Sequence, residues 1–155
     1  KLSTGGAILK AVKLIQSDDF LIQNGDTFIP INLDQVYSIR KKIKDKAIFM
    51  VLIKQKDVSR YGAFTLHKNH HVSLTKGIRN NKKLINGGIY VCNKQKLSKE
   101  FLDENKELSF ENDILPVFLN KNEVIGDFCD NPFIDIGVPI DYDRASVFLS
   151  EHFNS

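Results

Sequence analysis

The continuous apolar run from Ala47 to Ile53 indicates a β-strand that is buried on both of its faces. Strands of this kind occur in sheets that are covered by helices on both sides. Amphipathic helices are predicted nearby, because apolar residues recur every three or four positions within residues 6–17 and within residues 33–43. The run and its flanking segments therefore predict an α/β fold.

The rest of the chain alternates between strand and helix patterns, with one hairpin pattern between them. A length of 155 residues is that of a single domain. We expect one domain over residues 1–155, with a mixed, mostly parallel Rossmann-like sheet, helices on both faces and an inserted β-hairpin. The other predicted strands are 20–22, 61–66, 71–75, 84–92, 123–129 and 133–136, and the other predicted helices are 94–105, 109–120 and 139–153.

Composition excludes several classes of function. The net charge of +3 is spread among many lysines and forms no basic stripe, so no nucleic-acid partner is expected. No apolar stretch reaches the ~20 residues that a membrane span needs. Cys92 and Cys129 are too few for a disulfide framework and favour a reducing, cytoplasmic location. His67, His70 and His71 cluster at the predicted hairpin tip, without acids or cysteines at metal-binding spacing.

Two aspartates stand at the ends of short apolar runs. Asp26 follows Asn24-Gly25, and Asp135 lies within the sequence Phe133 to Gly137. Strand ends are where ligands bind in open α/β sheets, so we expect the two carboxylates to meet at one edge of the sheet and hold a divalent metal. Two alternatives stay open, a simple turn at Asp26 and a salt bridge or backbone cap at Asp135.

Glycines mark further candidate sites. The segment Ser3–Ala7 contains Gly5-Gly6, and Ser3 or Thr4 is suited to capping the helix that follows. Free N–H groups in such a loop suit an anion or the edge of a base. The glycines in Asn86–Gly88 interrupt an apolar strand, which indicates either a ligand or backbone approaching closely or a plain β-bulge. Lys76 and Arg79 are placed to reach a phosphate.

Taken in order, these motifs resemble those of the sugar-phosphate nucleotidyltransferases. Within that family they look most like the branch that transfers guanylyl groups to D-glycero-D-manno-heptose 1-phosphate. The resemblance covers nearly the whole chain. The matching segments, in sequence order, are Thr4–Ala7, Asn24–Asp26, Tyr61-Gly62, Lys76-Gly77, Leu84–Val91, Ser109–Pro116 and Phe133–Gly137.

The resemblance implies a reaction and a set of roles. A sugar 1-phosphate oxygen attacks the α-phosphorus of a nucleoside triphosphate, GTP in this branch, and pyrophosphate leaves. The nucleotide sugar would supply surface polysaccharide, and a homo-oligomer is common in the family. The implied site residues are Asp26 and Asp135 for Mg²⁺ and catalysis, Lys76 for the sugar phosphate, Thr4, Gly5, Gly6 and Gly25 for the nucleotide, and Asn86, Gly87, Gly88 and Gly62 for the sugar phosphate.

The sequence departs from the family pattern in several places. Thr75 stands where a glutamate is usual and Val138 where a threonine is, while Ser3 and Gly87 are mild changes. The opening strand, the glycine-rich loop with its arginine and the lysine that grip the triphosphate are absent, so we expect an N-terminally incomplete domain, inactive or weak alone. Alternatives are mannose or glucose 1-phosphate as substrate, a metal-dependent glycosyltransferase, and a non-catalytic homologue.

Overall fold

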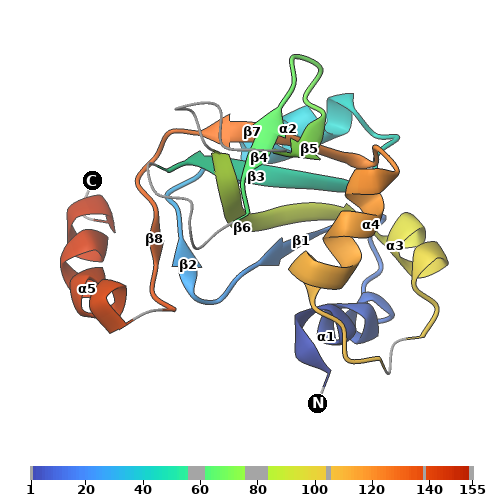
Figure 1. The fold of residues 1–155 in the computed structure, drawn as a ribbon, viewed down its shortest axis with the longest axis horizontal. Coiled ribbons are helices and arrows are strands. Elements are labelled where there is room, and N and C mark those ends of the chain that lie inside the picture. Colours follow the sequence, from blue (N-terminus) through green and yellow to red (C-terminus); the bar gives the residue numbers. More distant parts are fainter. Residues whose placement is uncertain (1, 56–61, 76–83, 104–105, 138, 154–155) are drawn as a thin grey trace.

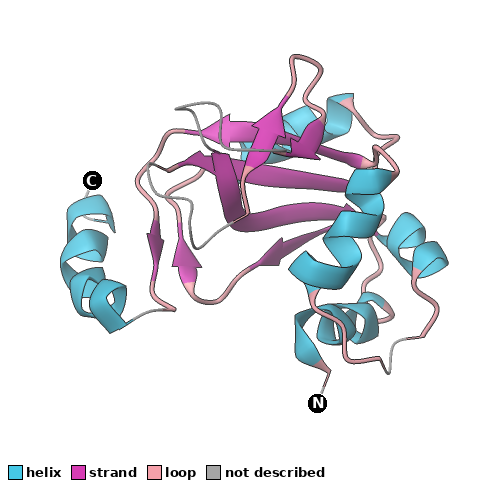
Figure 2. Cartoon of the chain, viewed as in Figure 1, coloured by secondary structure: helices cyan, strands magenta, loops and turns pink. Residues whose placement is uncertain are grey.

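A computed structural model describes residues 2–55, 62–75, 84–103, 106–137 and 139–153. Figure 1 shows a central sheet flanked by helices, with α5 and two short strands set to one side, and Figure 2 shows the same view by secondary structure. The elements are α1 (Ser3–Val12), β1 (Asp19–Gln23), β2 (Thr27–Phe28), α2 (Leu33–Lys42), β3 (Ile48–Lys54), β4 (Phe64–Leu66), β5 (Val72–Leu74), β6 (Leu84–Asn93), α3 (Lys94–Glu100), the π-helix η1 (Phe110–Ile114), α4 (Leu115–Asn120), β7 (Val124–Cys129), β8 (Ile134–Asp135) and α5 (Pro139–Phe153).

The main sheet has the order β5-β4-β6-β3-β7, and β1 pairs with β6 beside β4. The strands β1, β3, β4 and β7 run in one direction, and β5 and β6 run in the other. The expected mixed α/β sheet is confirmed. Among the described strands, however, only β3 and β7 are joined by parallel hydrogen bonding. The strands β1 and β4 run in the same direction as β3, but the antiparallel β6 separates them from it.

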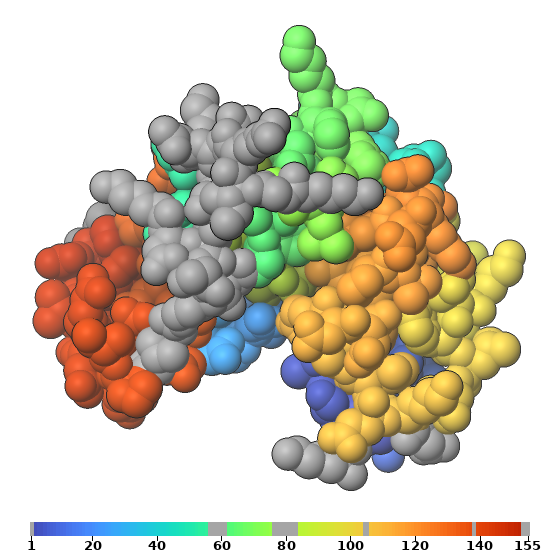
Figure 3. All heavy atoms as spheres, in the orientation of Figure 1, coloured from blue at the N-terminus to red at the C-terminus, as the bar shows by residue number. Residues whose placement is uncertain are grey.

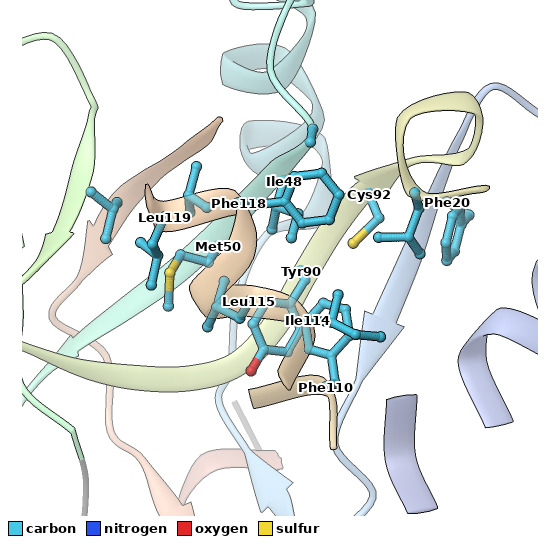
Figure 4. Packing of buried hydrophobic residues seen from close by; sticks show 14 of the residues in the cluster. Phe20, Ile48, Met50, Tyr90, Cys92, Phe110, Ile114, Leu115, Phe118 and Leu119 are labelled. Atoms are coloured by element: carbon cyan, nitrogen blue, oxygen red, sulfur yellow. The ribbon is translucent and has the colours of Figure 1, made fainter. Parts of the chain in front are cut away.

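Alternate side chains of β3 point to opposite faces of the sheet, and each face has its own core. Met50 belongs to the core shared with α1, α3, η1 and α4, which Figure 4 shows from close by. In that core the rings of Tyr90 and Phe110 meet edge-on, with their centroids 4.8 Å apart. Val51 belongs to the core on the other face, which Val36 of α2 covers. Helices therefore cover both faces, as the apolar run predicted.

The helix boundaries differ from expectation at several ends. The helix α1 begins at Ser3, and its N-cap residue Leu2 makes no side-chain cap, so the predicted capping by Ser3 or Thr4 is wrong. The third helix ends at Glu100, before the predicted end at residue 105. The segment predicted as one helix over 109–120 starts as a π-helix, which Ser109 caps through the N–H of Asn112, and continues as α4.

A buried ion pair joins α2 to β1. The guanidinium of Arg40 is 1% exposed, and its Nη2 lies 2.9 Å from Oδ1 of Asp19. Its Nη1 donates to the carbonyl oxygen of Ile43 at 2.8 Å, and the amide of Asn93 donates to the same Asp19 oxygen at 3.2 Å. These bonds hold the last turn of α2 against the start of β1.

The predicted hairpin is confirmed as β4 and β5, and it folds across the sheet to reach β7. The N–H of Gly126 donates to the carbonyl oxygen of His70 at 2.8 Å. A Cβ on Gly126 would lie 2.9 Å from Cγ2 of Val72, so the glycine allows this close packing. In the described segments no helix has the length and apolar character needed to cross a bilayer.

Candidate active site

Asp26 and Asp135 are brought together by the antiparallel pairing of β2 with β8. Thr27 lies opposite Asp135 in this pairing, and Asp26 is the residue immediately before Thr27. The N–H of Ile136 donates to the carbonyl oxygen of Asp26 at 2.8 Å, which extends the contact past the last pair. The expected convergence of the two aspartates is confirmed.

The sheet that joins the two aspartates is not the expected one. We predicted two strand ends of a single main sheet, but β2 and β8 form a separate two-stranded sheet. The chain turns at Gly25-Asp26 after β1, and Thr27 and Phe28 then pair with β8 instead of a strand of the main sheet. Local sequence pattern predicts a strand at Phe133–Ile136, but it does not state which partner that strand takes.

Gly137 leaves the space between the two carboxylates open. The point where a Cβ on Gly137 would lie is 3.0 Å from Oδ1 of Asp135 and 3.4 Å from Oδ2 of Asp26. The two oxygens are therefore at most 6.4 Å apart, the sum of 3.0 and 3.4 Å. The N–H of Gly137 donates to the same Asp135 oxygen at 2.9 Å and fixes the direction of that carboxylate.

The donors at this pair fit a hard divalent cation such as Mg²⁺. Two oxygens that share one Mg²⁺ lie within roughly 4.2 Å of each other, and rotation of the exposed Asp26 side chain can bring its oxygen nearer to that of Asp135. In the parts of the chain that the structure describes, no group of three or more histidine, cysteine, aspartate or glutamate residues is arranged to hold a metal. A cation at the pair would thus take its other ligands from substrate phosphates and water, as Mg²⁺ commonly does.

The Asn86–Gly88 segment is a bulge against which the Asp26 loop packs. The register of β3 against β6 shifts between Met50 and Leu52, opposite these residues, so the bulge interpretation is confirmed. Gly88 has a φ of 72°, and the N–H of Asn24 donates to its carbonyl oxygen at 2.8 Å. The backbone that approaches closely is therefore the loop that carries Asp26.

A polar cluster around Asn86 adds two residues that sequence reasoning did not assign. The amide nitrogen of Asn86 donates to the hydroxyl of Tyr90, and its Oδ1 accepts from the N–H of Gly88 at 3.0 Å. Burial raises the pKa of Tyr90, and the nearby carboxylate of Glu111 raises it further, so the phenol stays protonated. A glutamate two residues after the helix-capping Ser109 is the sequence signal that would have indicated this position.

Thr4, Gly5 and Gly6 lie at the other side of this cluster. The hydroxyl of Thr4 donates to Glu111 at 3.4 Å and accepts from the N–H of Phe110 at 2.9 Å. The N–H groups of Gly5 and Gly6 donate to the carbonyl oxygen of Leu108 at 2.6 and 3.1 Å. The expectation that these two N–H groups are free for a ligand is therefore wrong, because a neighbouring loop already accepts from them. Their assignment to a nucleotide site stays a prediction.

The remaining predicted site residues lie in different surroundings. Lys76 and Arg79 lie outside the described residues. Gly62 is exposed and stands before β4, while Gly25 is exposed in the turn before Asp26, with no atom within 4 Å of a Cβ built on it. Gly87 is buried and packs against Ile29 on the face that α2 covers.

The histidines of the hairpin are engaged with their surroundings. Nε2 of His67 lies 2.9 Å from the hydroxyl of Ser73, and Nδ1 of His70 lies 3.2 Å from the carbonyl oxygen of Gly126. The rings of His67 and His71 are stacked at a tilt, with centroids 5.4 Å apart. Both cysteines are free thiols.

The site opens into a hollow of the surface. Figure 3 shows this hollow between α5 on one side and the η1–α4 segment on the other, with the β1–β2 segment at its floor. The two aspartates come from the β2–β8 side, and the cluster of Thr4, Asn86 and Glu111 comes from the α1, β6 and η1 side. Carboxylates and polar side chains of this kind suit a substrate with a phosphate and hydroxyl groups.

Comparison with known families identifies the class of protein to which this fold and site belong. The model of the Nucleotidyl transferase family matches residues 1–152, so the chain belongs to that family. It is 32% identical over 152 residues to a D-glycero-α-D-manno-heptose 1-phosphate guanylyltransferase of Aneurinibacillus thermoaerophilus, which covers 97% of this chain and 64% of that protein. It is 34% identical over 142 residues to the enzyme with the same name in Campylobacter jejuni, covering 91% of this chain and 60% of that protein.

A similar fold has been solved. The crystal structure of HddC from Yersinia pseudotuberculosis aligns with a TM-score of 0.76 and 30% identity, over 96% of this chain and 63% of that chain. A second structure of HddC is complexed with GMP-PN and aligns with a TM-score of 0.75. The chain thus spans less than two thirds of the length of the relatives that it matches.

Proposed function

We propose that the protein of which this chain forms part transfers a guanylyl group from GTP to D-glycero-D-manno-heptose 1-phosphate and releases pyrophosphate. The convergence of Asp26 and Asp135 around the open space at Gly137 carries the proposal. The names of the two bacterial relatives and the GMP-PN complex of HddC support the choice of base and sugar. A cytoplasmic location is part of this proposal, and the free thiols of Cys92 and Cys129 support it.

Mg²⁺ bound by the two carboxylates would neutralise charge on the α-phosphate of the nucleotide. The chain's own contribution is to position this pair. Asp135 is oriented by the N–H of Gly137, and the Asp26 loop is held by hydrogen bonds from Asn24 to Gly88 and from Ile136 to Asp26. Positioning and charge stabilisation are the main terms in phosphoryl and nucleotidyl transfer, so this rigidity matters for rate.

The polar cluster across the hollow is suited to the sugar. The amide nitrogen of Asn86 can donate a hydrogen bond to a hydroxyl, whereas the carboxylate of Glu111 accepts one. The protonated hydroxyl of Tyr90 holds the Asn86 amide in place. In this proposal Glu111 accepts from a sugar hydroxyl, Asn86 contacts the ring, and Lys76 meets the sugar phosphate.

Pyrophosphate release by the full-length protein tests the proposal. GTP should be compared with ATP, CTP, UTP and dTTP, and heptose 1-phosphate with mannose and glucose 1-phosphates. The proposal expects GTP with the heptose to give the highest kcat/KM, and expects Asp26→Asn and Asp135→Asn each to lower it on the order of 100-fold or more. Asp34→Asn, at the exposed start of α2, is the matched control and should leave activity unchanged.

Each of the other possible results of this assay would support a different function. A preference for mannose or glucose 1-phosphate would keep the reaction class and change the substrate. Consumption of a nucleotide sugar in place of GTP would indicate a glycosyltransferase. Absence of turnover together with absence of Mg²⁺-dependent GTP binding would indicate a non-catalytic homologue.

A further inference from the structure

The sequence contains two Asn-Gly pairs, Asn24-Gly25 and Asn86-Gly87, which lie in contrasting surroundings. In such a pair the backbone nitrogen of the glycine can attack the side-chain carboxamide carbon of the asparagine. Glycine favours this attack because it has no Cβ to hinder the approach and because its backbone adopts conformations that other residues avoid. An Asn-Gly pair is therefore a place where asparagine is lost chemically, provided that the backbone is free to bend.

The first pair, Asn24-Gly25, leads into the exposed turn between β1 and β2. Figure 1 shows this connection as a loop outside the main sheet. Gly25 is exposed, and no atom lies within 4 Å of a Cβ built on it. Among the residues that the structure describes, none accepts a hydrogen bond from the N–H of Gly25, and none bonds the side-chain amide of Asn24. Substrate must reach the adjoining Asp26 in the proposed function, so the turn is open in the full-length protein as well.

The second pair, Asn86-Gly87, lies within the strand β6. The amide nitrogen of Asn86 donates to the hydroxyl of Tyr90, and its Oδ1 accepts from the N–H of Gly88 at 3.0 Å. Gly87 is buried, and a Cβ on it would lie 3.0 Å from the carbonyl oxygen of Val51. The carboxamide and the backbone beside it are both held in place, so the same attack requires local unfolding of the strand.

We propose that Asn24 is a site of spontaneous deamidation, whereas Asn86 is protected by the fold. The backbone nitrogen of Gly25 loses its proton to solvent base and bonds to Cγ of Asn24, and the side-chain nitrogen takes up a proton and leaves as ammonia. Water, the only co-reactant, then opens the cyclic succinimide at either of its carbonyls. One product is aspartate, and the other is isoaspartate, in which the main chain runs through the former side chain.

The isoaspartate product displaces Asp26, and this consequence rests on the proposed function. It adds a methylene group to the main chain of a loop that backbone hydrogen bonds hold at both sides of Asp26. The N–H of Asn24 donates to the carbonyl oxygen of Gly88, and the N–H of Ile136 donates to that of Asp26. A longer loop cannot keep both bonds in place, so the carboxylate of Asp26 moves away from that of Asp135 and the shared cation is lost.

Mass spectrometry of peptides from the full-length protein tests the proposal, after incubation in mildly alkaline buffer and digestion at acidic pH. Deamidation replaces NH₂ by OH and raises the mass of the peptide, and chromatography separates isoaspartate from aspartate. In the folded protein Asn24 should react on the order of tenfold faster than Asn86, or more, because two hydrogen bonds of Asn86 must break first. In guanidinium chloride the two should react at similar rates, since glycine follows both.

Gly25→Ala is the matched variant, because its added methyl group meets no atom within 4 Å. It should slow the loss of Asn24 at least about fivefold, since alanine has less backbone freedom than glycine. The Mn²⁺ affinity of the parent protein should fall in proportion to its isoaspartate content, while Gly25→Ala keeps over the same incubation the affinity with which it starts.

Three results would overturn the assignment of the site and leave the proposed function, which turnover tests, untouched. They are an intact Asn24 in the folded protein, loss of Asn24 and Asn86 at equal rates there, and an unslowed loss in Gly25→Ala. A difference between the two asparagines that persists in guanidinium chloride would overturn the protection by the fold. Isoaspartate that accumulates at position 24 with unchanged Mn²⁺ affinity would overturn the displacement of Asp26.

Discussion

The hydroxyl oxygen of Thr27 lies 2.7 Å from the point that a Cβ atom on Gly88 would occupy. Thr27 pairs with Asp135 in the small sheet, and Gly88 forms part of the bulge in β6. This close approach therefore connects β6, which carries Asn86 of the proposed sugar site, to β2, which pairs with the strand of Asp135. The hydroxyl is buried and has no hydrogen-bond partner among the described residues, so it is held by packing alone.

Gly88→Ala should destabilise the protein and displace the Asp26 loop. The new methyl group would meet Thr27 and the side chain of Asn24, and a φ of 72° disfavours any residue with a Cβ. We expect a loss of about 1–3 kcal/mol in the free energy of unfolding, measured by urea denaturation. Gly25→Ala is the matched control, because no atom lies within 4 Å of its added Cβ. Equal losses in the two variants would contradict the packing described.

Gly137→Ala should weaken metal binding more than it weakens folding. A Cβ there would stand 3.0 Å from one carboxylate oxygen and 3.4 Å from the other, in the space that a cation would share. We expect Mn²⁺ affinity, measured by electron paramagnetic resonance, to fall about 10- to 100-fold. Gly62→Ala, whose nearest neighbour is 3.9 Å away, should leave this affinity unchanged. Unaltered affinity in Gly137→Ala would place the cation elsewhere.

Asp19→Asn should destabilise the fold through the buried Arg40. The substitution removes the carboxylate from a guanidinium that is 1% exposed, and the charge left behind has no equivalent partner. Breaking a buried ion pair in this way costs about 3–5 kcal/mol, and the 31% exposure of Asp19 favours the lower figure. Glu100→Gln breaks the more exposed pair with Lys121 and should cost less than about 1 kcal/mol. A smaller loss in Asp19→Asn than in Glu100→Gln would be inconsistent with the buried pair.

Stability should fall at alkaline pH because of Cys92. Burial raises the pKa of this thiol above its ordinary value of 9.0, so the folded protein keeps the proton while the unfolded chain releases it. The folded state is thus fully favoured below pH 9 and loses stability above it, by up to about 1.4 kcal/mol per pH unit. Urea unfolding from pH 8 to 10 should show a shallower decline in Cys92→Ala than in the parent protein. Identical slopes would show that Cys92 does not contribute.

The sequence indicates the elements better than their pairing. The apolar run at Ala47–Ile53 is a buried strand with helices on both sides, and the hairpin around Asn69-His70 forms as expected, because both depend on local patterns. The insertion of β6 between β3 and β1 could not be read from periodicity, since an antiparallel and a parallel strand of the same composition look alike.

The candidate site could likewise be predicted only in part, because local patterns indicate strand ends but not which strands pair. Asp26 and Asp135 each follow an apolar run, which predicts that both lie near strand ends, and in this fold class strand ends gather where ligands bind. The separate sheet that joins them depends on a turn far from Asp135 in sequence. The use of the Gly5 and Gly6 N–H groups by Leu108 is likewise a contact between distant segments, which glycine spacing does not encode.

The shared cation is the central claim, and Mn²⁺ binding in the presence of GTP tests it most directly. The full-length protein should bind one tightly held ion, and Asp26→Asn and Asp135→Asn should each weaken it by a similar factor. The double variant should lose little more than either single variant, because both side chains act on one ion. Losses that add in full, or a double variant that binds Mn²⁺ as tightly as the parent protein, would contradict the account.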